Sequence, residues 1–395
     1  MARRLLSLLA VLSLPLVLGM PALAQEVAFE PVVDGLGFAS NVAFAPDGTA
    51  FVADKDVGQI RIVRNGRLLD EPFASLPVLV TVNETGLLGV AVHPRFPAEP
   101  WVYAYYTDRD LGASRLVRIR AEGDVGVEVD PLVDLVPVAG FHNGGDIAFG
   151  PDGALYVVTG DGTVPERAQD PDDPGGKVLR LNPDGTIPAD NPIPGSPVFA
   201  LGIRNSFGIC FDPVTGDLWE TENGPDRFDE VNRIEAGRNY GWPEQLGPGG
   251  APAFADPVLA FATVIVPTGC AVTADGSALY LATYPGSLHR LALPPGGQPR
   301  DQVVAELPGP TADLARAPDG SIWVTTNEAI YRFEVAEATP SPAPSSPTVV
   351  PSGSEPPVAT PSPAAGSTGL TPAAIVVGLV ILGGLLLFRA RMPRG

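Results

Sequence analysis

Three segments of the chain hold residue types that can bind a ligand or move a proton. Each interrupts a run of alternating apolar and polar residues with glycines and polar side chains, as backbone near a ligand often does. The segments read NETGLLGVAVHP from Asn83, GFHNGGDIAFGPDGALYVVTGDG from Gly140, and LGIRNSFGICFDP from Leu201, which is followed by ETENGPDRFDEVNRIEAGRNYGWP up to Pro243. The chemistry of the protein is therefore expected in these segments.

His142 and Arg204 are the side chains in these segments best suited to act on a substrate. His142 precedes a Gly-Gly pair and the start of an apolar strand, and Arg204-Asn205 occupies the equivalent place before a later strand. The two positions are therefore expected to converge on one pocket. A lone histidine is more often a structural residue than a base, so the residues alone leave both interpretations of His142 open.

The loop from Glu222 to Tyr240 is rich in oxygen atoms that could bind a metal. It contains a turn that exposes backbone carbonyls, together with several carboxylates: Gly224-Pro225, Asp226, Asp229 and Glu230. Calcium takes six to eight oxygen ligands of these kinds, so the loop is a candidate calcium site. An acidic surface loop on an acidic protein is the alternative interpretation.

Composition and missing motifs exclude several classes of protein. The 395 residues carry a formal net charge of −20 with no basic cluster outside the two ends, so nucleic acid is not an expected partner. Two cysteines are too few for a four-thiolate zinc site. The sequence contains no GxSxG, P-loop or HExxH motif. Glycine and proline, at 45 residues each, favour short strands and turns over helical bundles.

The elements that must position these residues form a repeat. Six segments combine an apolar stretch, a Pro-Asp-Gly-like turn and a β-rich run, and their period-two alternation predicts a β-hairpin in each. Their turns lie 44 to 62 residues apart, at Pro46, Pro94, Pro151, Pro213, Ala274 and Pro318. The remaining residues of each period suffice for two more strands. The repeat therefore predicts an all-β fold, a six-bladed β-propeller.

Closure of the propeller ring requires a strand from the N-terminal side. The last repeat ends near Phe333, too early for four strands, so a strand near Val27 to Val33 is expected to complete that blade. Propellers host many unrelated functions, so the fold by itself indicates none of them.

Both ends of the chain are predicted to lie outside the propeller, which we expect to span residues 25–337. Residues 1–24 combine Arg3-Arg4, an apolar run and a small-residue cleavage site that ends at Ala24. This pattern indicates a secretory signal peptide, with an uncleaved anchor helix as the alternative.

The C-terminal end is predicted to anchor the protein in a membrane. Residues 338–369 hold nine prolines and no aromatic residue, and should form an extended linker. Residues 370–388 are 19 uncharged residues, long enough for one transmembrane helix, and the basic tail 389–395 follows. We expect a single-pass protein of the cell membrane whose main domain is extracellular or periplasmic. A sorting signal that is removed after export is the alternative.

At the chemistry-bearing segments the sequence resembles the soluble quinoprotein glucose/sorbosone dehydrogenase family. The resemblance covers residues 30–333 and is carried by GLLGVAVHPRF, FHNGGDIAFGPDGALYVVTGD, GIRNSFGICFDP and ENGPDRFDEVNRIEAGRNYGWP. It implies a six-bladed propeller that binds pyrroloquinoline quinone (PQQ) and Ca²⁺. It also implies oxidation of an aldose sugar by hydride transfer to the quinone, with an unknown electron acceptor.

The resemblance assigns roles to individual residues. His142 is implied as the base that takes the proton of the sugar C1 hydroxyl, and Arg204 as the residue that faces the reacting quinone oxygen. Contacts to the cofactor are implied for Glu84, Asn143, Arg204, Asn205, Asn223 and Asp229. Ligands to calcium are implied at the carbonyls of Gly224 and Pro225, and at Asp229, Glu230 and Tyr240.

The chain departs from the family pattern where cations are expected. Well-studied members have an Arg-x-Arg-Asp stretch that grips the carboxylates of the cofactor, whereas this chain has Pro310-Thr311-Ala312-Asp313. The lysine expected after the fifth hairpin is also absent from ALYLATYPGSLHR. PQQ carries three carboxylic acids, so these losses predict weakened binding. The alternative function is therefore a calcium-stabilised surface propeller that binds a carbohydrate or protein without redox chemistry, and a metal-dependent hydrolase is a third hypothesis.

The two cysteines are candidates for a disulfide bond. Cys210 and Cys270 lie in the opening strands of consecutive repeats, at positions that differ by one residue relative to the turn. Export permits oxidation, but the offset predicts side chains on opposite faces of their strands. The sequence leaves the pairing open.

Overall fold

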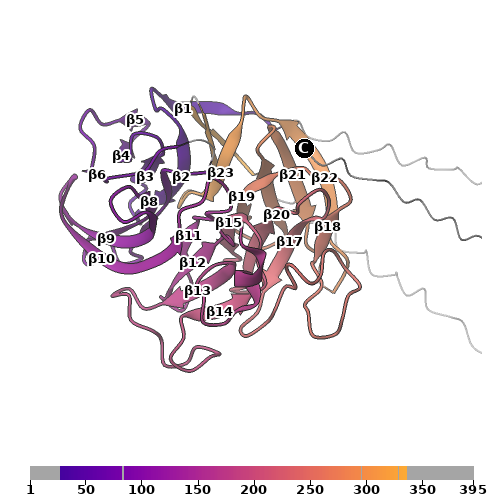
Figure 1. Cartoon of the computed structure of the whole chain (residues 1–395). Helices are drawn as coiled ribbons and strands as arrows, with labels where there is room; N and C mark the ends of the chain where they lie inside the picture. Colours follow the sequence, from indigo (N-terminus) through magenta and orange to yellow (C-terminus); the bar gives the residue numbers. More distant parts are fainter. Residues whose placement is uncertain (1–26, 82–83, 295, 328, 336–395) are drawn as a thin grey trace, which may run out of the picture. The chain divides into compact units, whose positions relative to one another are not determined.

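The computed structural model describes residues 27–81, 84–294, 296–327 and 329–335. Within this part the chain forms six antiparallel sheets, five of four strands and one of five. Each sheet contacts the next through its innermost strand, and these strands, β2, β7, β11, β15, β19 and β23, close a ring (Figure 1). The predicted all-β, six-bladed propeller is confirmed.

The blades follow one another in chain order, with the innermost strand first. Blade 1 consists of β2 (Ala39–Phe44), β3 (Ala50–Asp54), β4 (Gln59–Arg64), β5 (Arg67–Leu68) and β6 (Ala74–Ser75). Blade 2 consists of β7 (Leu87–Val92), β8 (Trp101–Asp108), β9 (Ala113–Glu122) and β10 (Val125–Pro137). Blade 3 consists of β11 (Ile147–Phe149), β12 (Leu155–Thr159), β13 (Lys177–Leu181) and β14 (Val198–Leu201), with the 3₁₀ helix η1 (Pro165–Gln169) between β12 and β13.

The second half of the ring repeats this plan. Blade 4 consists of β15 (Ser206–Phe211), β16 (Leu218–Glu222), β17 (Asp229–Ile234) and β18 (Leu259–Phe261). Blade 5 consists of β19 (Pro267–Val272), β20 (Ala278–Thr283), β21 (Ser287–Ala292) and β22 (Arg300–Glu306). Blade 6 consists of β23 (Thr311–Arg316), β24 (Ile322–Thr326), β25 (Ala329–Phe333) and β1 (Glu30–Asp34).

All six predicted hairpins are present. They are the antiparallel pairs β2–β3, β7–β8, β11–β12, β15–β16, β19–β20 and β23–β24. In the β11–β12 turn Gly153 has a φ of 80°, a conformation that residues with a β-carbon rarely adopt. A Pro-Asp-Gly turn is therefore a good predictor of a hairpin, because its glycine can adopt the positive φ that the turn needs.

The N-terminal strand closes the ring, as predicted. β1 pairs antiparallel with β25, so a strand from the start of the domain forms the outer edge of the last blade. The strand spans Glu30–Asp34, which starts three residues later than the expected range. Hydrogen bonds between the two ends of the domain thus hold blade 6 together.

Apolar side chains from facing blades form the core. Between blades 1 and 2, for example, the buried set includes Phe51, Ile62, Val90 and Val117. Near the centre of the ring the inner strands approach so closely that a β-carbon on Gly208 would overlap the carbonyl oxygen of Thr268 in the next blade. The glycines at these strand starts therefore permit the close packing of the ring.

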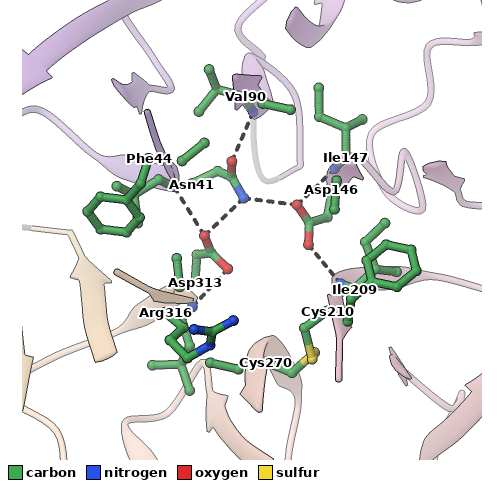
Figure 2. Close-up of a pocket in the computed structure, with 18 of the residues that line it drawn as sticks. Asn41, Phe44, Val90, Asp146, Ile147, Ile209, Cys210, Cys270, Asp313 and Arg316 are labelled. Carbon is green, nitrogen blue, oxygen red and sulfur yellow. Dashed lines mark hydrogen bonds between the residues drawn. A yellow bond between two sulfur atoms is a disulfide. The ribbon is translucent and has the colours of Figure 1, made fainter. Parts of the chain in front are cut away.

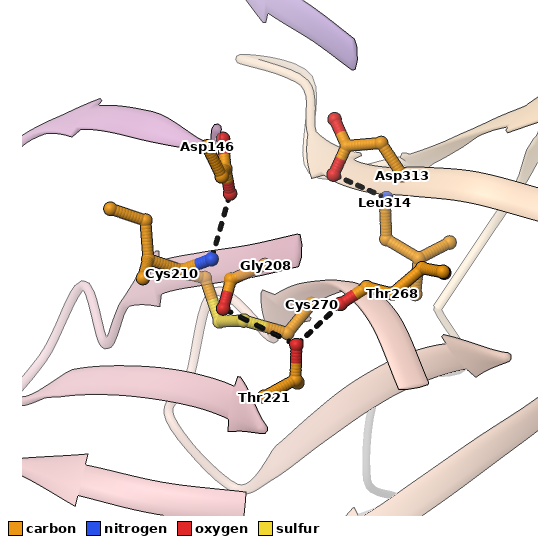
Figure 3. The surroundings of a disulfide bond; sticks show 9 residues. Asp146, Gly208, Cys210, Thr221, Thr268, Cys270, Asp313 and Leu314 are labelled. Atoms are coloured by element: carbon orange, nitrogen blue, oxygen red, sulfur yellow. Dashed lines mark hydrogen bonds between the residues drawn. A yellow bond between two sulfur atoms is a disulfide. The ribbon is translucent and has the colours of Figure 1, made fainter. Parts of the chain in front are cut away.

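A disulfide bond joins two neighbouring blades. Cys210 on β15 is bonded to Cys270 on β19, with their Cα atoms 5.7 Å apart (Figure 3). The two cysteines differ by one residue in their position relative to the turn, so their side chains are on opposite faces of their own strands, and the bond uses this arrangement. Blades stack face to face, so the front of blade 4 meets the back of blade 5, and two side chains on opposite faces of their own strands meet between the blades.

The predicted signal peptide, linker, transmembrane helix and basic tail lie outside the described residues. Among the residues that are described, no helix is long and apolar enough to cross a bilayer. The membrane anchor at residues 370–388 stays a prediction from the sequence.

Candidate functional site

His142 lies in the segment that leads into β11, and its backbone has an unusual conformation. Its φ of 61° falls in the left-handed region, which residues other than glycine rarely adopt. Two hydrogen bonds hold it there. The N–H donates to Oε2 of Glu84 at 2.5 Å, and the carbonyl accepts from the N–H of Gly162 at 3.0 Å. Strained backbone that is held this firmly is typical of functional positions.

Asp161 orients the imidazole ring of His142. Its Oδ1 lies 2.7 Å from Nδ1 of His142, and its Oδ2 accepts a hydrogen bond of 2.8 Å from Nε1–H of Trp242. A buried carboxylate at Nδ1 favours the tautomer that carries its proton there, which leaves Nε2 free to accept another. The sequence alone does not single out Asp161, although a signal exists in the Gly160-Asp161-Gly162 turn of the same motif.

Glu84 connects His142 to two further residues with a predicted role at the cofactor. Its Oε2 accepts a hydrogen bond from Nδ2–H of Asn205 at 3.1 Å, and its backbone carbonyl accepts one from Nδ2–H of Asn143 at 2.9 Å. Burial raises the pKa of the Glu84 carboxyl above its ordinary value. The structure therefore brings Glu84, His142, Asn143 and Asn205 together, although they come from three different blade junctions.

Arg204 lies beside this cluster, against the ring of Trp242. Its guanidinium carbon is 5.3 Å from the centre of that ring, and its Nη1 donates to the carbonyls of Asn223 at 2.8 Å and Gly224 at 3.3 Å. Its buried Nε has no hydrogen-bond partner among the described residues. Asp161 accepts a hydrogen bond from Trp242 and donates its backbone N–H to the carbonyl of Arg204 at 2.9 Å. His142 and Arg204 are therefore connected, because both contact Asp161.

The predicted metal ligands do not all lie at one point. Both carboxylate oxygens of Asp229 are taken by backbone N–H groups, from Gly224 at 2.8 Å, Ile265 at 2.6 Å and Val266 at 2.8 Å. Pro225 lies on an exposed turn. The Gly224 carbonyl accepts from Arg204. In this structure Asp229 therefore holds the loop in place, and it has no free oxygen that faces the Gly224-Pro225 turn.

Glu230 and Tyr240 instead line a small cavity together with Glu222 and Gln245. The hydroxyl of Tyr240 donates to the carbonyl of Arg233 at 2.6 Å, so it is already engaged. Burial raises the pKa of Glu230 to about 7, and burial together with the neighbouring carboxylates raises that of Glu222. Buried Oε1 of Gln245 has no partner among the described residues. The cavity thus brings together the carboxyl groups of Glu222 and Glu230 and the unpartnered amide oxygen of Gln245.

No group of three or more His, Cys, Asp or Glu side chains within the described ranges is arranged to hold a metal ion. A cation in the Glu222–Glu230 cavity would therefore need amide and carbonyl oxygens as well as carboxylates. Calcium accepts such mixed oxygen ligands. The donor chemistry of this cavity, including the unpartnered amide oxygen of Gln245, fits calcium better than any softer metal.

A cavity of about 290 Å³ lies beside His142, at the starts of the inner strands. Its lining is mostly apolar, and several of its side chains received no role in the sequence analysis: Phe38, Lys55, Phe207 and Tyr284. Glu84 and the neighbours of His142 in the chain also line it. The cavity is near the lower end of the usual volume range for ligand pockets, roughly 300 to 1,000 Å³. We call it the channel-mouth cavity.

A second cavity of about 400 Å³ opens at the opposite ends of the same strands (Figure 2). A polar network separates the two cavities. Nδ2–H of Asn41 donates to Asp146 at 3.0 Å and to Asp313 at 2.9 Å, and its Oδ1 accepts from the N–H of Val90 at 2.9 Å. Burial raises the pKa of both carboxyl groups, and they also interact with each other. Asp146 lines both cavities.

Known proteins resemble this chain in both fold and sequence. A solved structure from Thermus thermophilus, provisionally assigned as an oxidoreductase (glucose dehydrogenase), is 38% identical to this chain and has a TM-score of 0.72. The match covers 78% of this chain and 99% of that chain. The PQQ-bound aldose sugar dehydrogenase of Streptomyces coelicolor is 32% identical at a TM-score of 0.72, with 78% of this chain and 98% of that chain covered.

Curated sequences point to the same group. Quinoprotein glucose dehydrogenase B of Acinetobacter calcoaceticus is 30% identical over 282 residues, which are 62% of this chain. The match spans 59% of the length of that relative. The sequence model described as Glucose / Sorbosone dehydrogenase matches residues 38–332, nearly the whole propeller. The chain belongs to the glucose/sorbosone dehydrogenase family.

Proposed function

We propose that the propeller oxidises an aldose sugar by transfer of a hydride from C1 to PQQ. One observation carries the proposal: a histidine oriented by a buried carboxylate lies among residues that line the channel-mouth cavity. Family membership and the likeness to the PQQ-bound enzyme of Streptomyces coelicolor support the same reaction. The specific sugar and the electron acceptor are not part of the proposal.

His142 removes the proton from the sugar hydroxyl. Because Nδ1 is bound to Asp161, Nε2 takes this proton, and the Asp161 carboxylate then stabilises the imidazolium that forms. When bound, PQQ supplies the carbonyl carbon that accepts the hydride. The proton and the hydride account for the two hydrogens that the sugar loses as it becomes a lactone.

The channel-mouth cavity fits a flat, aromatic, anionic cofactor. Phe38, Phe141, Phe207 and Tyr284 offer ring surfaces, and Lys55 offers a positive charge. These contacts support PQQ at this position.

Beside the cavity, Arg204 is the proposed donor to the oxygen on which negative charge develops. Its buried Nε–H lacks a partner among the described residues. Hydrogen-bond donors directed at developing negative charge make a large contribution to lowering the barrier of an enzymatic reaction. Its contact with Trp242, which also binds Asp161, ties this donor to the base. The predicted contacts of Asn143, Asn205 and Asn223 with the cofactor remain part of the proposal.

Calcium is proposed at the cavity lined by Glu222, Glu230 and Gln245. The ion would neutralise two buried carboxylates and satisfy the unpartnered Oε1 of Gln245. Glu230 and Tyr240, which both line this cavity, are the residues retained from the sequence prediction. Calcium at the carbonyls of Gly224 and Pro225, in contact with the quinone, stays a second and separate prediction.

The catalytic domain is proposed to act outside the cytoplasmic membrane. The disulfide bond between Cys210 and Cys270 supports export, because such bonds persist in oxidising compartments. The single-pass anchor at residues 370–388 is proposed from the hydropathy of the sequence alone.

Reconstitution tests the proposal. The purified protein is mixed with PQQ and Ca²⁺, and reduction of an artificial dye is followed with a panel of aldoses. Turnover with at least one aldose, lost in His142→Ala while PQQ still binds, is the expected result. Sugar binding without dye reduction would favour the alternative function, a surface propeller without redox chemistry. The observation that favours this alternative is that Pro310 and Ala312 are uncharged where the family pattern has two arginines.

A further inference from the structure

We propose that the ammonium group of Lys55 binds a carboxylate of the cofactor in the channel-mouth cavity. The inference rests on the proposed function, because it concerns how this chain holds an anionic aromatic ligand. It adds a binding residue on blade 1, on the wall of the cavity formed by residues around β2 and β3.

Lys55 is the one basic residue among the described residues that line this cavity. Its backbone is fixed on two sides, since its N–H donates to the carbonyl of Phe38 at 2.8 Å and its carbonyl accepts from the N–H of Leu87 at 3.0 Å. Its side chain is 14% exposed, and its Nζ lies 5.4 Å from the centre of the Phe38 ring. The ammonium group therefore lies over the ring of Phe38, which lines the same cavity.

The present partner of Lys55 is a weak competitor. Nζ lies 2.9 Å from Oδ1 of Asp56, but the Asp56 side chain is 51% exposed. An ion pair with an exposed partner contributes little stability, because water screens the charges. A ligand carboxylate inside the cavity is shielded from water on more sides, so its attraction to Lys55 is stronger. The ammonium group can exchange Asp56 for the ligand.

The other charged residues of the lining do not offer an alternative. The Glu84 carboxylate is bound by the N–H of His142 and by Asn205, and Asp146 is bound by Asn41 and by backbone N–H groups. Both are acids, which repel an anion or at best stay neutral. Ala312 contributes an uncharged wall from blade 6. A ligand with several carboxylates therefore gains most by directing one of them toward blade 1.

Direct binding of PQQ tests the inference without any measurement of turnover. Apo-protein is titrated with PQQ at fixed Ca²⁺, and quenching of tryptophan fluorescence gives Kd for each variant. Lys55→Met is expected to raise Kd roughly 10- to 100-fold, the loss of one charge-assisted hydrogen bond. Lys55→Arg should stay near wild type because it keeps the charge. Asp56→Asn should lower Kd because it removes the competing partner.

A matched control separates the local contact from the overall charge. Arg109 is an exposed arginine that does not line the cavity, so Arg109→Met removes one positive charge elsewhere and should leave Kd unchanged. Equal Kd values for wild type and Lys55→Met would overturn the inference and leave the proposed function intact. Failure of wild type to bind PQQ would overturn both. If Lys55→Met melts early, the Lys55→Arg and Asp56→Asn values decide the question.

Discussion

Nδ1 of His142 lies 2.7 Å from Oδ1 of Asp161, a fully buried carboxylate that also binds Trp242. The contact decides which nitrogen of the imidazole is free to act as a base. Asp161 is therefore a positioning residue, whose effect on a substrate passes through His142.

Asp161→Asn is expected to lower kcat roughly 10²- to 10⁴-fold, the usual range for loss of general-base function. The amide can donate to Nδ1 and so favours the wrong tautomer of His142. The Kd for PQQ should change little, because Asp161 is not part of the cavity lining. Steady-state kinetics and PQQ titration measure the two effects, and a kcat within threefold of wild type would contradict the assignment.

The bond between Cys210 and Cys270 should account for a large share of the stability of the domain. It closes a loop with a sequence separation of 60 residues, and the chain-entropy estimate for such a loop is about 4 kcal/mol. The variant with both cysteines changed to serine should melt at a lower temperature than wild type. Reducing agent should lower the melting temperature of wild type and leave that of the variant unchanged. Two free thiols in the denatured, unreduced protein would exclude the bond.

The Asp146–Asn41–Asp313 network should make stability depend on pH. Burial raises the pKa of Asp146 from 3.8 to about 7, so the folded state favours the protonated acid. Its contribution to stability is present below about pH 4 and is lost as pH rises to about 7. The melting temperature of wild type should fall across this window relative to that of Asp146→Asn. Asp172→Asn, which removes an exposed carboxyl, should keep the wild-type slope. Parallel curves for wild type and Asp146→Asn would contradict the prediction.

Calcium should raise the melting temperature, and chelation should lower it. An ion that binds only the folded state at 100 times its Kd adds about 2.7 kcal/mol of stability. Glu230→Gln should lose most of this response, because Glu230 lines the proposed cavity. Glu244→Gln changes an exposed glutamate nearby and should respond like wild type. A chelator that leaves the wild-type melting curve unmoved would remove calcium from the proposal.

Ala312→Arg should tighten PQQ binding about tenfold, since it adds a cation to the wall of the channel-mouth cavity. The same substitution should partly rescue Lys55→Met, because either cation can pair with a carboxylate of the ligand. Fluorescence titration of the two single variants and the double variant measures the coupling. A double variant that binds PQQ as weakly as Lys55→Met alone would mean that the arginine at position 312 does not reach the ligand.

The repeat and the fold follow from local features of the sequence. Each hairpin needs only a turn residue such as Gly153 and a period-two alternation on either side, so about fifteen adjacent residues suffice to predict it. The strand that closes blade 6 follows from the missing fourth strand. His142, Glu84, Asn143 and Asn205 lie within recognisable motifs, and the structure joins them by hydrogen bonds.

The calcium ligands and the cationic residue of the channel-mouth cavity are harder to predict from the sequence. Asp229 lies in an acidic motif that suggests a metal, yet three backbone N–H groups occupy its oxygens. Whether a carboxylate is free depends on how distant loops fold against it, and motif spacing carries no information on that point.

The sequence by itself determined the number of blades, the hairpins that open them, the family and the histidine motif, because these depend on neighbours in the chain. Only the tertiary structure decided that Asp161 orients His142, that Cys210 bonds to Cys270 and that Lys55 faces the cavity. Contacts of this kind depend on loop conformation and on the stacking of one blade face against the next. The alternation along a single strand specifies which face a side chain is on, but not which residue of the neighbouring blade it meets.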